Sequence, residues 1–348
     1  MFDPRASGQF ISSKSKDVTI QRDGVTKTAR LIFKSISEGT FVATDWLAQE
    51  LHPKSRDKAA VDWCFLVDTL NFSFWTQSDD AHFEVSYKGC TYTGYFAACA
   101  CVNRALDKGI PITDSKFYSD ISLEDLQRIF KDDHGRVIPL CEERRQVLTE
   151  AGHILIDKFG GSFYSCLEQA QGSALNLLRL IVENFPSYQD VGVYQGSKVS
   201  FYKRAQILVA DVWRALNSEG VCAFSDIDQI TIFADYRVPQ VLAFLGALHY
   251  SPRLLEKLRN KEELASGGEL EMEIRGCTIH ACELILAELK ELLKTAKTNG
   301  SDCTQRVDGS SYPVNAITVD NYLWCLRRER REEVESTVPF HRTRSIFY

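Results

Sequence analysis

The sequence predicts a mostly helical protein, built as a single domain with a small β-hairpin near its N-terminus. Segments with apolar residues three or four positions apart recur along most of the 348 residues, and this spacing is typical of amphipathic helices. Strand patterns are few, and the chain shows no alternation of strands and helices and no glycine-rich phosphate loop. We expect one domain over 1–348, with a mixed helix and hairpin portion at 1–115 and a helical portion at 116–348.

The helical spacing occurs in the segments 27–37, 55–70, 122–130, 140–158, 173–185, 200–217, 238–249, 278–297 and 318–334. Several of these segments also carry end signals. Gly39 and Gly160 follow helical patterns and are expected stops. Ser122, with Asp125 three residues later, is a variant of the capping box, and Pro239 stands in a first turn, where proline is tolerated.

Three segments carry a strand pattern. Residues 82–95 alternate around Lys88-Gly89, which predicts a β-hairpin. Residues 230–233 (ITIF) and 270–276 (LEMEIRG) are expected to form short strands. The polar stretch 297–313, rich in Gly and Ser, predicts a surface loop.

The composition is that of an ordinary globular protein, with 44% hydrophobic and 25% charged residues. The formal net charge is −6, from 41 basic and 47 acidic residues, which disfavours a protein that wraps long nucleic acid. A local basic pocket for a small phosphate remains compatible with this acidic total. No apolar run approaches the roughly 20 residues of a membrane span, and the N-terminus lacks a secretory pattern. We therefore expect a soluble protein of the cytosol or nucleus.

Eleven cysteines are spread along the chain without a CxxC pair. Zinc sites usually show closely spaced pairs of ligands, so we expect free thiols, mostly buried, in a reducing compartment, and no metal site. No Ser-His-Asp order and no HExxH motif is present.

Asp68 and Asn71 interrupt an apolar run that continues into the aromatic residues Phe72, Phe74 and Trp75. A buried carboxylate and a buried amide both need hydrogen-bond partners. One interpretation is a pocket wall that stacks a planar ligand. The other is a capped helix end with aromatic residues in the core.

Ser200 is the expected N-cap of the 200–217 helix, which places Lys203 and Arg204 in its first turn. Cations in that turn oppose the helix dipole unless an anion lies at the helix N-terminus. The pattern therefore suggests a phosphate site. The alternatives are a solvent-facing pair, or Lys203 paired with a nearby acid.

Asp235 stands between the apolar segment 230–233 and the helix that begins near Pro239. A rigid segment on each side makes this a good position for a catalytic carboxylate, held by Phe233 and Tyr236. The alternative is a helix cap, with Arg237 paired to it.

Asp320 and Trp324 share a helix face because they are four residues apart. Together they could grip a purine-like ring; alternatively, Asp320 complements the helix dipole above a core tryptophan. The apolar end of the chain, Ile346 to Tyr348, should dock on the body and bring His341, Arg342 and Arg344 towards a pocket.

A set of motifs in order along the chain resembles the queuosine salvage protein family, the queuosine 5′-phosphate N-glycosylases/hydrolases. The motifs are DTLNFSFW (68–75), IPIT (110–113), EERR (142–145), FGGSF (159–163), SFYKRAQILVADVW (200–213), FADYRVPQVLAFLGAL (233–248), EIRGC (273–277), DNYLW (320–324) and PFHRTR (339–344). The resemblance covers nearly the whole chain. It implies a helical core similar to that of the DNA glycosylase superfamily. One departure is Cys325, where the family often has an acid.

The resemblance implies hydrolysis of the bond between ribose 5′-monophosphate and queuine, a 7-deazaguanine base, for salvage into tRNA. Asp235 would stabilise or attack the oxocarbenium-like centre, and Arg237 would favour its ionised form. Asp320 would accept from the edge of the base. Phe72, Phe233 and Trp324 would sandwich the ring, and Lys203 would bind the phosphate with His341, Arg342 or Tyr236. Arg237 and His52 are the other expected substrate-binding residues.

The expected partner is the small-molecule nucleotide alone, bound by a monomer without cofactor, metal, duplex nucleic acid or membrane. One alternative is a DNA-glycosylase-like base-excision enzyme, which should show a basic face. The other is a non-catalytic binder of a deazaguanine nucleotide. Because the expected site residues come from both ends of the chain, they favour one domain over two.

Overall fold

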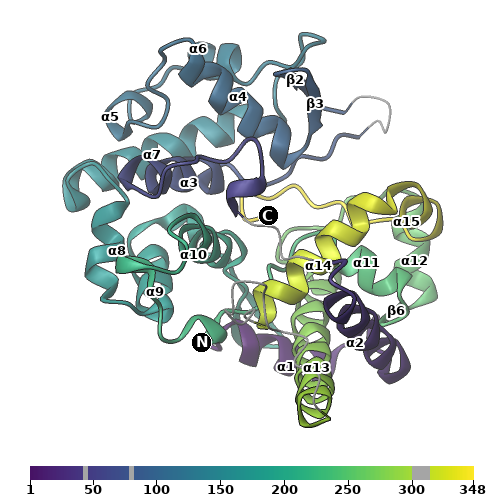
Figure 1. Ribbon diagram of the computed structural model, residues 1–348. Coiled ribbons are helices and arrows are strands. Elements are labelled where there is room, and N and C mark those ends of the chain that lie inside the picture. Colours follow the sequence, from purple (N-terminus) through teal and green to yellow (C-terminus); the bar gives the residue numbers. More distant parts are fainter. Residues whose placement is uncertain (42–45, 78–81, 300–313) are drawn as a thin grey trace. The chain divides into compact units, whose positions relative to one another are not determined.

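The computed structural model describes residues 1–41, 46–77, 82–299 and 314–348 of the chain. The prediction of a mostly helical fold is confirmed, because helices account for most of the elements from Pro4 to Thr337 (Figure 1). The chain divides into two compact units, which we describe separately. The first unit comprises Met1–Thr44, Asp190–Lys203 and Ile230–Arg344, and the second comprises Asp45–Gln189, Arg204–Gln229 and Ser345–Tyr348. The single domain and the glycosylase-like core stay predictions.

The first unit contains helices and two pairs of short strands. Its helices are α1 (Pro4–Lys14), α2 (Arg22–Ser37), α11 (Val238–Phe244), α12 (Pro252–Arg259), α13 (Glu269–Thr298), α14 (Ala316–Glu329) and α15 (Arg331–Thr337). Its strands are β1 (Val18–Ile20), β4 (Val191–Tyr194), β5 (Ser197–Ser200) and β6 (Leu248–Tyr250). β1 pairs antiparallel with β6, and β4 pairs antiparallel with β5.

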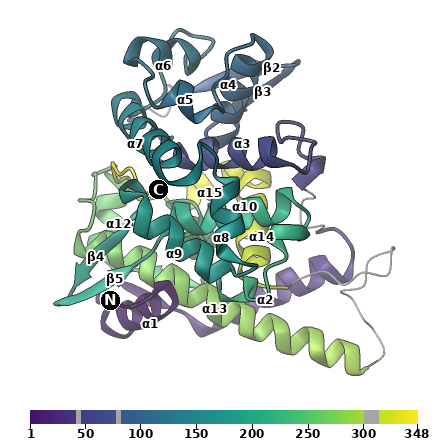
Figure 2. The same ribbon diagram turned by 90° about the vertical axis from the view of Figure 1, so that its left-hand side faces the viewer.

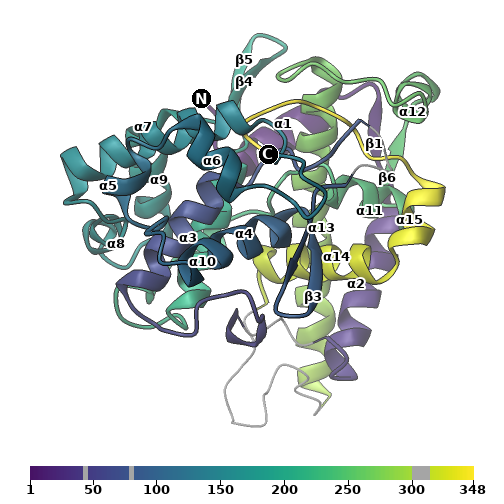
Figure 3. The same ribbon diagram turned by 90° about the horizontal axis from the view of Figure 1, so that it is seen from above.

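The long helix α13 (Figure 2) packs against several helices and strands of the first unit. α1 and α2 pack along it, and Figure 3 shows α2 and α13 side by side. Glycines allow the close approach of α1: a Cβ on Gly276 would lie 2.6 Å from Ile11, and one on Gly8 would lie 2.9 Å from Ile279. The part of α13 next to these contacts is buried on all sides, and it carries Glu271, Glu273 and Arg275.

The second unit is also built from helices, with one hairpin. Its helices are α3 (Lys58–Thr69), α4 (Tyr95–Asp107), α5 (Ser115–Tyr118), α6 (Leu123–Ile129), α7 (Cys141–Phe159), α8 (Tyr164–Ala170), α9 (Ala174–Asn184) and α10 (Lys203–Ala215), the last of which begins at the final residue of a first-unit segment. Its strands are β2 (Glu84–Tyr87) and β3 (Cys90–Thr93), and its short 3-10 helices are η1 (Trp46–Ala48), η2 (Pro186–Tyr188), η3 (Gly220–Cys222) and η4 (Ile227–Gln229).

The predicted hairpin around Lys88-Gly89 is confirmed as β2 and β3. Both turn residues have positive φ, 47° for Lys88 and 83° for Gly89, which matches the twist of a two-residue hairpin turn. Elsewhere in this unit, the Phe65 and Phe163 rings stack with centroids 4.7 Å apart, and Phe185 packs against Phe65 at 5.2 Å. Aromatic packing therefore forms part of the core of this unit.

Two predicted helix ends, at Ser122 and Gly160, agree with the structure. Ser122 Oγ accepts from the Asp125 amide at 3.0 Å, and Gly160 ends α7 with φ of 62°. The predicted helix over 318–334 is interrupted, because α14 ends at Glu329 and α15 begins at Arg331. Most of the predicted loop 297–313 lies outside the described residues, which stop at 299 and resume at 314.

Both additional strand predictions are wrong. Residues 230–233 form no strand in the described part of the chain, and the Phe233 amide donates to the Asp320 side chain instead. Residues 270–276 belong to α13. Their apparent alternation arises because Glu271 and Glu273 are buried with polar partners, so that two core positions of a helix carry charged residues.

The cysteines that the structure describes are free, and most are buried, as expected. Burial raises the pKa of Cys64 and Cys99 well above the ordinary range, so that these thiols stay protonated. In the described part of the chain, no helix is long and apolar enough to cross a membrane.

Candidate active site

Asp235 is held by the backbone at the start of α11. Its Oδ1 accepts from the amides of Arg237 at 2.8 Å and Val238 at 2.9 Å. Amide donors to a carboxylate are charge-assisted and strong. The side chain is half-buried, and Oδ2 has no hydrogen-bond partner among the described residues. One oxygen therefore fixes the carboxylate, and the other is left for a ligand.

The alternative of a helix cap is confirmed in part: Asp235 Oδ1 accepts from the first amide of α11, that of Val238, although the N-cap residue itself is Arg237. The accompanying expectation of an ion pair with Arg237 is wrong. The Arg237 guanidinium instead donates to Gln240 Oε1 at 3.2 Å and to Glu335 Oε1 at 3.4 Å, and it lies over the Phe340 ring at 4.2 Å.

Asp320 on α14 is joined to the segment that precedes Asp235. Its Oδ1 accepts from the Phe233 amide at 3.1 Å, and both residues are buried. Trp324 lies one turn further along α14, with the Arg328 guanidinium 4.9 Å from its ring centroid. Asp320 therefore fixes the backbone of one aromatic residue and shares a helix with another.

The segment near the C-terminus packs against the residues that follow Asp235. The Phe340 ring lies 5.5 Å from the Tyr236 ring and 4.4 Å from the Arg342 guanidinium. The carbonyl of Arg342 accepts from the Leu264 amide at 2.7 Å, which anchors the segment. The end of the chain docks as predicted, within the second unit. The Ser73 amide donates to the main-chain oxygen of Tyr348, and the Tyr348 side chain is buried.

His341 is buried, with 2% of its surface exposed. Burial, reinforced by repulsion from the Arg275 guanidinium, lowers its pKa to about 3. The imidazole is therefore neutral near pH 7, and it can offer a phosphate a hydrogen bond but no charge.

Lys203 is the first residue of α10 and is buried, with 4% exposed. Its amide donates to Asp190 Oδ2 at 3.1 Å. The predicted Ser200 cap is wrong, because Ser200 ends β5 and its Oγ donates to the Phe2 carbonyl at 2.7 Å. Arg204 is also buried and donates to the Thr69 carbonyl at 2.5 Å, so the solvent-facing alternative for the pair is wrong.

Two predicted residues belong to the second unit. The Phe72 ring is 1% exposed and has the guanidinium carbons of Arg144 at 4.3 Å and Arg204 at 5.2 Å. His52 stacks on Trp46 with centroids 3.7 Å apart, and burial lowers its pKa to about 3. The roles of Phe72 and His52 in binding stay predictions.

The first unit contains the other predicted residues, namely Lys203, Phe233, Asp235, Tyr236, Arg237, Asp320, Trp324, His341 and Arg342. The contacts above join Asp320 to Phe233, and Tyr236 and Arg237 to the Phe340–Arg342 segment. These side chains combine a fixed carboxylate, aromatic rings and cations, which is the set that a phosphorylated nucleoside requires.

Comparison with known proteins decides the family. A family model described as queuosine salvage protein matches residues 51–348. The chain belongs to the queuosine salvage protein family. Its relatives include proteins named queuosine 5′-phosphate N-glycosylase/hydrolase from Mus musculus, 46% identical over 346 residues, and from Bos taurus, 47% identical over 348 residues, each alignment covering 99% of this chain and 98% of the relative. The protein of the same name from Schizosaccharomyces pombe is 38% identical over 358 residues, with 98% of each chain covered.

Arg275 and Asp190 are two residues of the chain that contact the candidate site and that the sequence did not indicate. The Arg275 Nε donates to the Ala234 carbonyl at 2.9 Å, directly before Asp235, and the other nitrogens bond Asp190. A signal was present in the EIRGC motif at 273–277. Because the pattern over 270–276 predicted a strand, it did not indicate that Arg275 lies in the buried part of a long helix.

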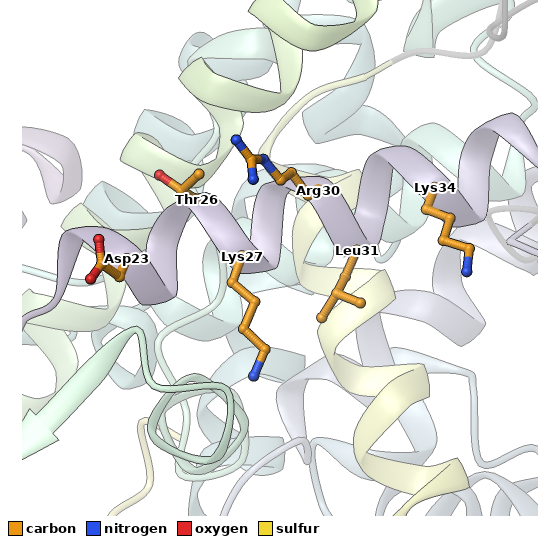
Figure 4. Close-up of a pocket in the computed structure, with 6 residues that line it drawn as sticks. All are labelled: Asp23, Thr26, Lys27, Arg30, Leu31 and Lys34. Atoms are coloured by element: carbon orange, nitrogen blue, oxygen red, sulfur yellow. The ribbon is translucent and has the colours of Figure 1, made fainter.

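A shallow surface hollow of this family member lies on α2, away from the predicted residues in the sequence. It is lined by Asp23, Thr26, Lys27, Arg30, Leu31 and Lys34, which all project from this one helix (Figure 4). None of the predicted site residues lines it. The described residues contain no cluster of His, Cys, Asp and Glu that could hold a metal ion.

Proposed function

We propose that the chain hydrolyses the N-glycosidic bond of queuosine 5′-phosphate and releases queuine, with Asp235 as the carboxylate at the anomeric carbon. The observation that carries this proposal is the state of Asp235, whose Oδ1 is fixed by two amides while Oδ2 has no partner among the described residues. The names of relatives that align with nearly the whole chain support the substrate.

The chemistry needs a fixed negative charge. As the bond between carbon and nitrogen breaks, its electron pair leaves with the base, and positive charge grows at the anomeric carbon. An ionised carboxylate held close to that carbon stabilises the charge or attacks the carbon directly. Water then supplies hydroxyl to the sugar carbon, and its proton is transferred to the departing base. Asp235 needs no rearrangement for this role, because its cap bonds already set its orientation.

In this proposal, Asp320, Phe233 and Trp324 bind the base of the substrate. A 7-deazaguanine has carbon in place of N7, so protonation at that position cannot assist its departure. Asp320 would accept from the ring N–H and the exocyclic amine, and the aromatic rings would stack on the base. The bond from the Phe233 amide to Asp320 Oδ1 supports this assignment, because it couples the acid to an aromatic residue.

In this proposal, Lys203 binds the phosphate of the substrate together with Tyr236, His341 and Arg342. Lys203 would supply charge at the start of α10, and the neutral His341 would supply a hydrogen bond. Arg342 would add a second cation. Arg237 would help to position Arg342, because the guanidinium groups of both residues contact the Phe340 ring.

We further propose that the chain acts as a monomer on the free nucleotide, in the cytosol or nucleus, without cofactor, duplex nucleic acid or membrane. The net charge of −6 supports a small substrate over duplex DNA.

The test is an assay of the purified chain with queuosine 5′-phosphate, in which products are separated by chromatography. We expect queuine and ribose 5-phosphate in equal amounts. Guanosine 5′-monophosphate, which has N7 and lacks the queuine side chain, should release no base. Failure to release queuine, or equal release of guanine, would overturn the proposal.

A further inference from the structure

Arg275 is a buried arginine with partners on three sides. It lies on α13, and 2% of its surface is exposed. A guanidinium has five N–H donors in a planar fork, so it can hold several acceptors at once in fixed directions. The Phe201 ring lies 4.2 Å from its central carbon and restricts the plane of the fork.

The first partner is Asp190. The two terminal nitrogens of Arg275 donate to the two oxygens of this carboxylate, at 2.9 and 2.5 Å. Asp190 Oδ2 also accepts from the Lys203 amide at 3.1 Å, and the Asp190 carbonyl accepts from the Phe201 amide at 2.9 Å. Asp190 therefore fixes the backbone at the start of α10, from which the Lys203 side chain extends.

The second partner is the peptide group before Asp235. Arg275 Nε donates to the Ala234 carbonyl at 2.9 Å. This bond fixes the peptide plane that joins Ala234 to Asp235. The far side of Asp235 is fixed by its own bonds to the amides of Arg237 and Val238.

The third partner balances the charge. Glu271, one turn earlier on α13, accepts from Arg275 at 3.1 Å and is 1% exposed. Two carboxylates thus surround one guanidinium in the interior. Removing the cation would leave buried acids uncompensated, and a lysine could not reproduce the fork, because its ammonium is a single point of donation.

We infer that Arg275 is a positioning residue that holds the Asp235 peptide and the Lys203 backbone in one register. This inference rests on the function proposed above for Asp235 and Lys203. Arg275 touches no substrate in this account. It sets the relation between the carboxylate at the anomeric carbon and the cation at the phosphate, so that both ends of one nucleotide are held together.

The test is Arg275→Lys, which keeps the charge and loses the fork. We expect kcat with queuosine 5′-phosphate to fall by about 10- to 100-fold, since a misplacement of about 1 Å can cost about 100-fold. The preference for the 5′-phosphate over the bare nucleoside, measured as a ratio of kcat/KM values, should shrink because Lys203 is displaced relative to Asp235.

The matched control is Glu273→Gln, two residues earlier on the same helix. Glu273 is buried and accepts from Tyr194 and from the amides of Lys16 and Asp17. Among the described residues it bonds neither Asp190 nor Ala234, and it is not in the proposed site. We expect it to lower the thermal midpoint while kcat and the phosphate preference stay within about twofold of the parent values. A purely structural role for Arg275 predicts the same behaviour for both variants and would overturn the inference.

A double-mutant cycle separates this inference from the proposed function. If Arg275 acts through Asp235, then Arg275→Lys should cost little further activity in an Asp235→Asn background, because residues that act as a unit are not additive. Additive losses would contradict the inference and leave the role of Asp235 intact. Full activity of Asp235→Asn alone would contradict the proposed function itself.

Should Arg275→Lys fail to fold, Asp190→Asn provides the second variant. It keeps the shape of the side chain and removes the charge that Arg275 pairs with. We expect a lower phosphate preference in a folded protein, because the Lys203 amide loses its charged acceptor. An unchanged preference in folded Asp190→Asn would overturn the inference.

Discussion

At Lys203 the backbone and the side chain have separate tasks. The amide is bonded to Asp190, which fixes the start of α10, and the proposed task of the side chain is to bind the substrate phosphate. A similar separation is proposed at Asp235, where Oδ1 accepts from two amides and Oδ2 is available for the proposed reaction.

We predict that Lys203→Ala raises the KM for queuosine 5′-phosphate by about 10-fold or more, because a charged hydrogen bond contributes about 1.5–3 kcal/mol. The KM for the bare nucleoside should change much less. Lys27→Ala, at an exposed position on α2, is the control and should alter neither value. Equal effects on both substrates would contradict the phosphate assignment.

His341 makes a prediction about pH. Its pKa is lowered by burial to about 3, below the ordinary value of 6.5, so the unfolded chain binds a proton between these values and the folded chain does not. Stability is therefore lost as the pH falls from about 6.5 towards 3, by about 1.4 kcal/mol per pH unit from this one group.

We expect His341→Gln to reduce that slope of the unfolding free energy by about 1.4 kcal/mol per pH unit, measured by urea denaturation between pH 6 and pH 4. The exposed His249→Gln is the control and should keep the parent slope. If the two variants show the same slope, His341 is not held neutral by burial.

At the residue scale, the sequence predicted candidate site residues only where a charged side chain stands in an unusual local position. Asp235, Asp320 and Lys203 were found because charged residues interrupt apolar patterns or open a helix. Asp190 and Arg275 were not, because their roles come from bonds between residues 85 positions apart. The Ser200 cap was a reasonable local prediction, but Asp190 takes that place from a preceding segment.

At the scale of elements, α1 packs closely on α13 at Gly276, the residue that follows Arg275. We predict that Gly276→Ala lowers the free energy of unfolding by about 1–3 kcal/mol, because overpacking forces the helices apart. The added Cβ would lie 2.6 Å from Ile11. Urea denaturation provides the measurement.

Glu291→Ala is the control for this substitution, because Glu291 is exposed on the same helix. A change within about 0.5 kcal/mol is expected there, as for most surface positions. A comparably small effect of Gly276→Ala would show that the two helices can separate without cost.

Helices with caps were predictable because the signals are local, as at Ser122 and Gly160. The strands β1 and β6 were not, because their pairing joins Val18 to Tyr250, far apart in the sequence. The start of α13 was missed for a different reason. Its buried glutamates produce an alternation that imitates a strand, and only their partners in the fold explain them.

At the scale of the whole molecule, the charge of −6 bears on the choice of substrate. A protein that binds duplex DNA releases counterions and shows affinity that falls steeply with salt. We predict that a large excess of duplex DNA at low salt leaves the rate of queuine release unchanged. Inhibition that disappears as salt is raised would instead favour a base-excision enzyme. Duplex RNA of the same length is the control for charge alone.

The most direct test of the account is Asp235→Asn. Asparagine can keep the bonds from the amides of Arg237 and Val238, because its carbonyl oxygen also accepts at such positions, so the fold should hold while the charge is lost. Asp23→Asn, an exposed change of the same kind, is the control. We predict that Asp235→Asn lowers queuine release in a single turnover by about 100-fold or more, with the dissociation constant of queuosine 5′-phosphate nearly unchanged. Full activity in this variant would contradict the account.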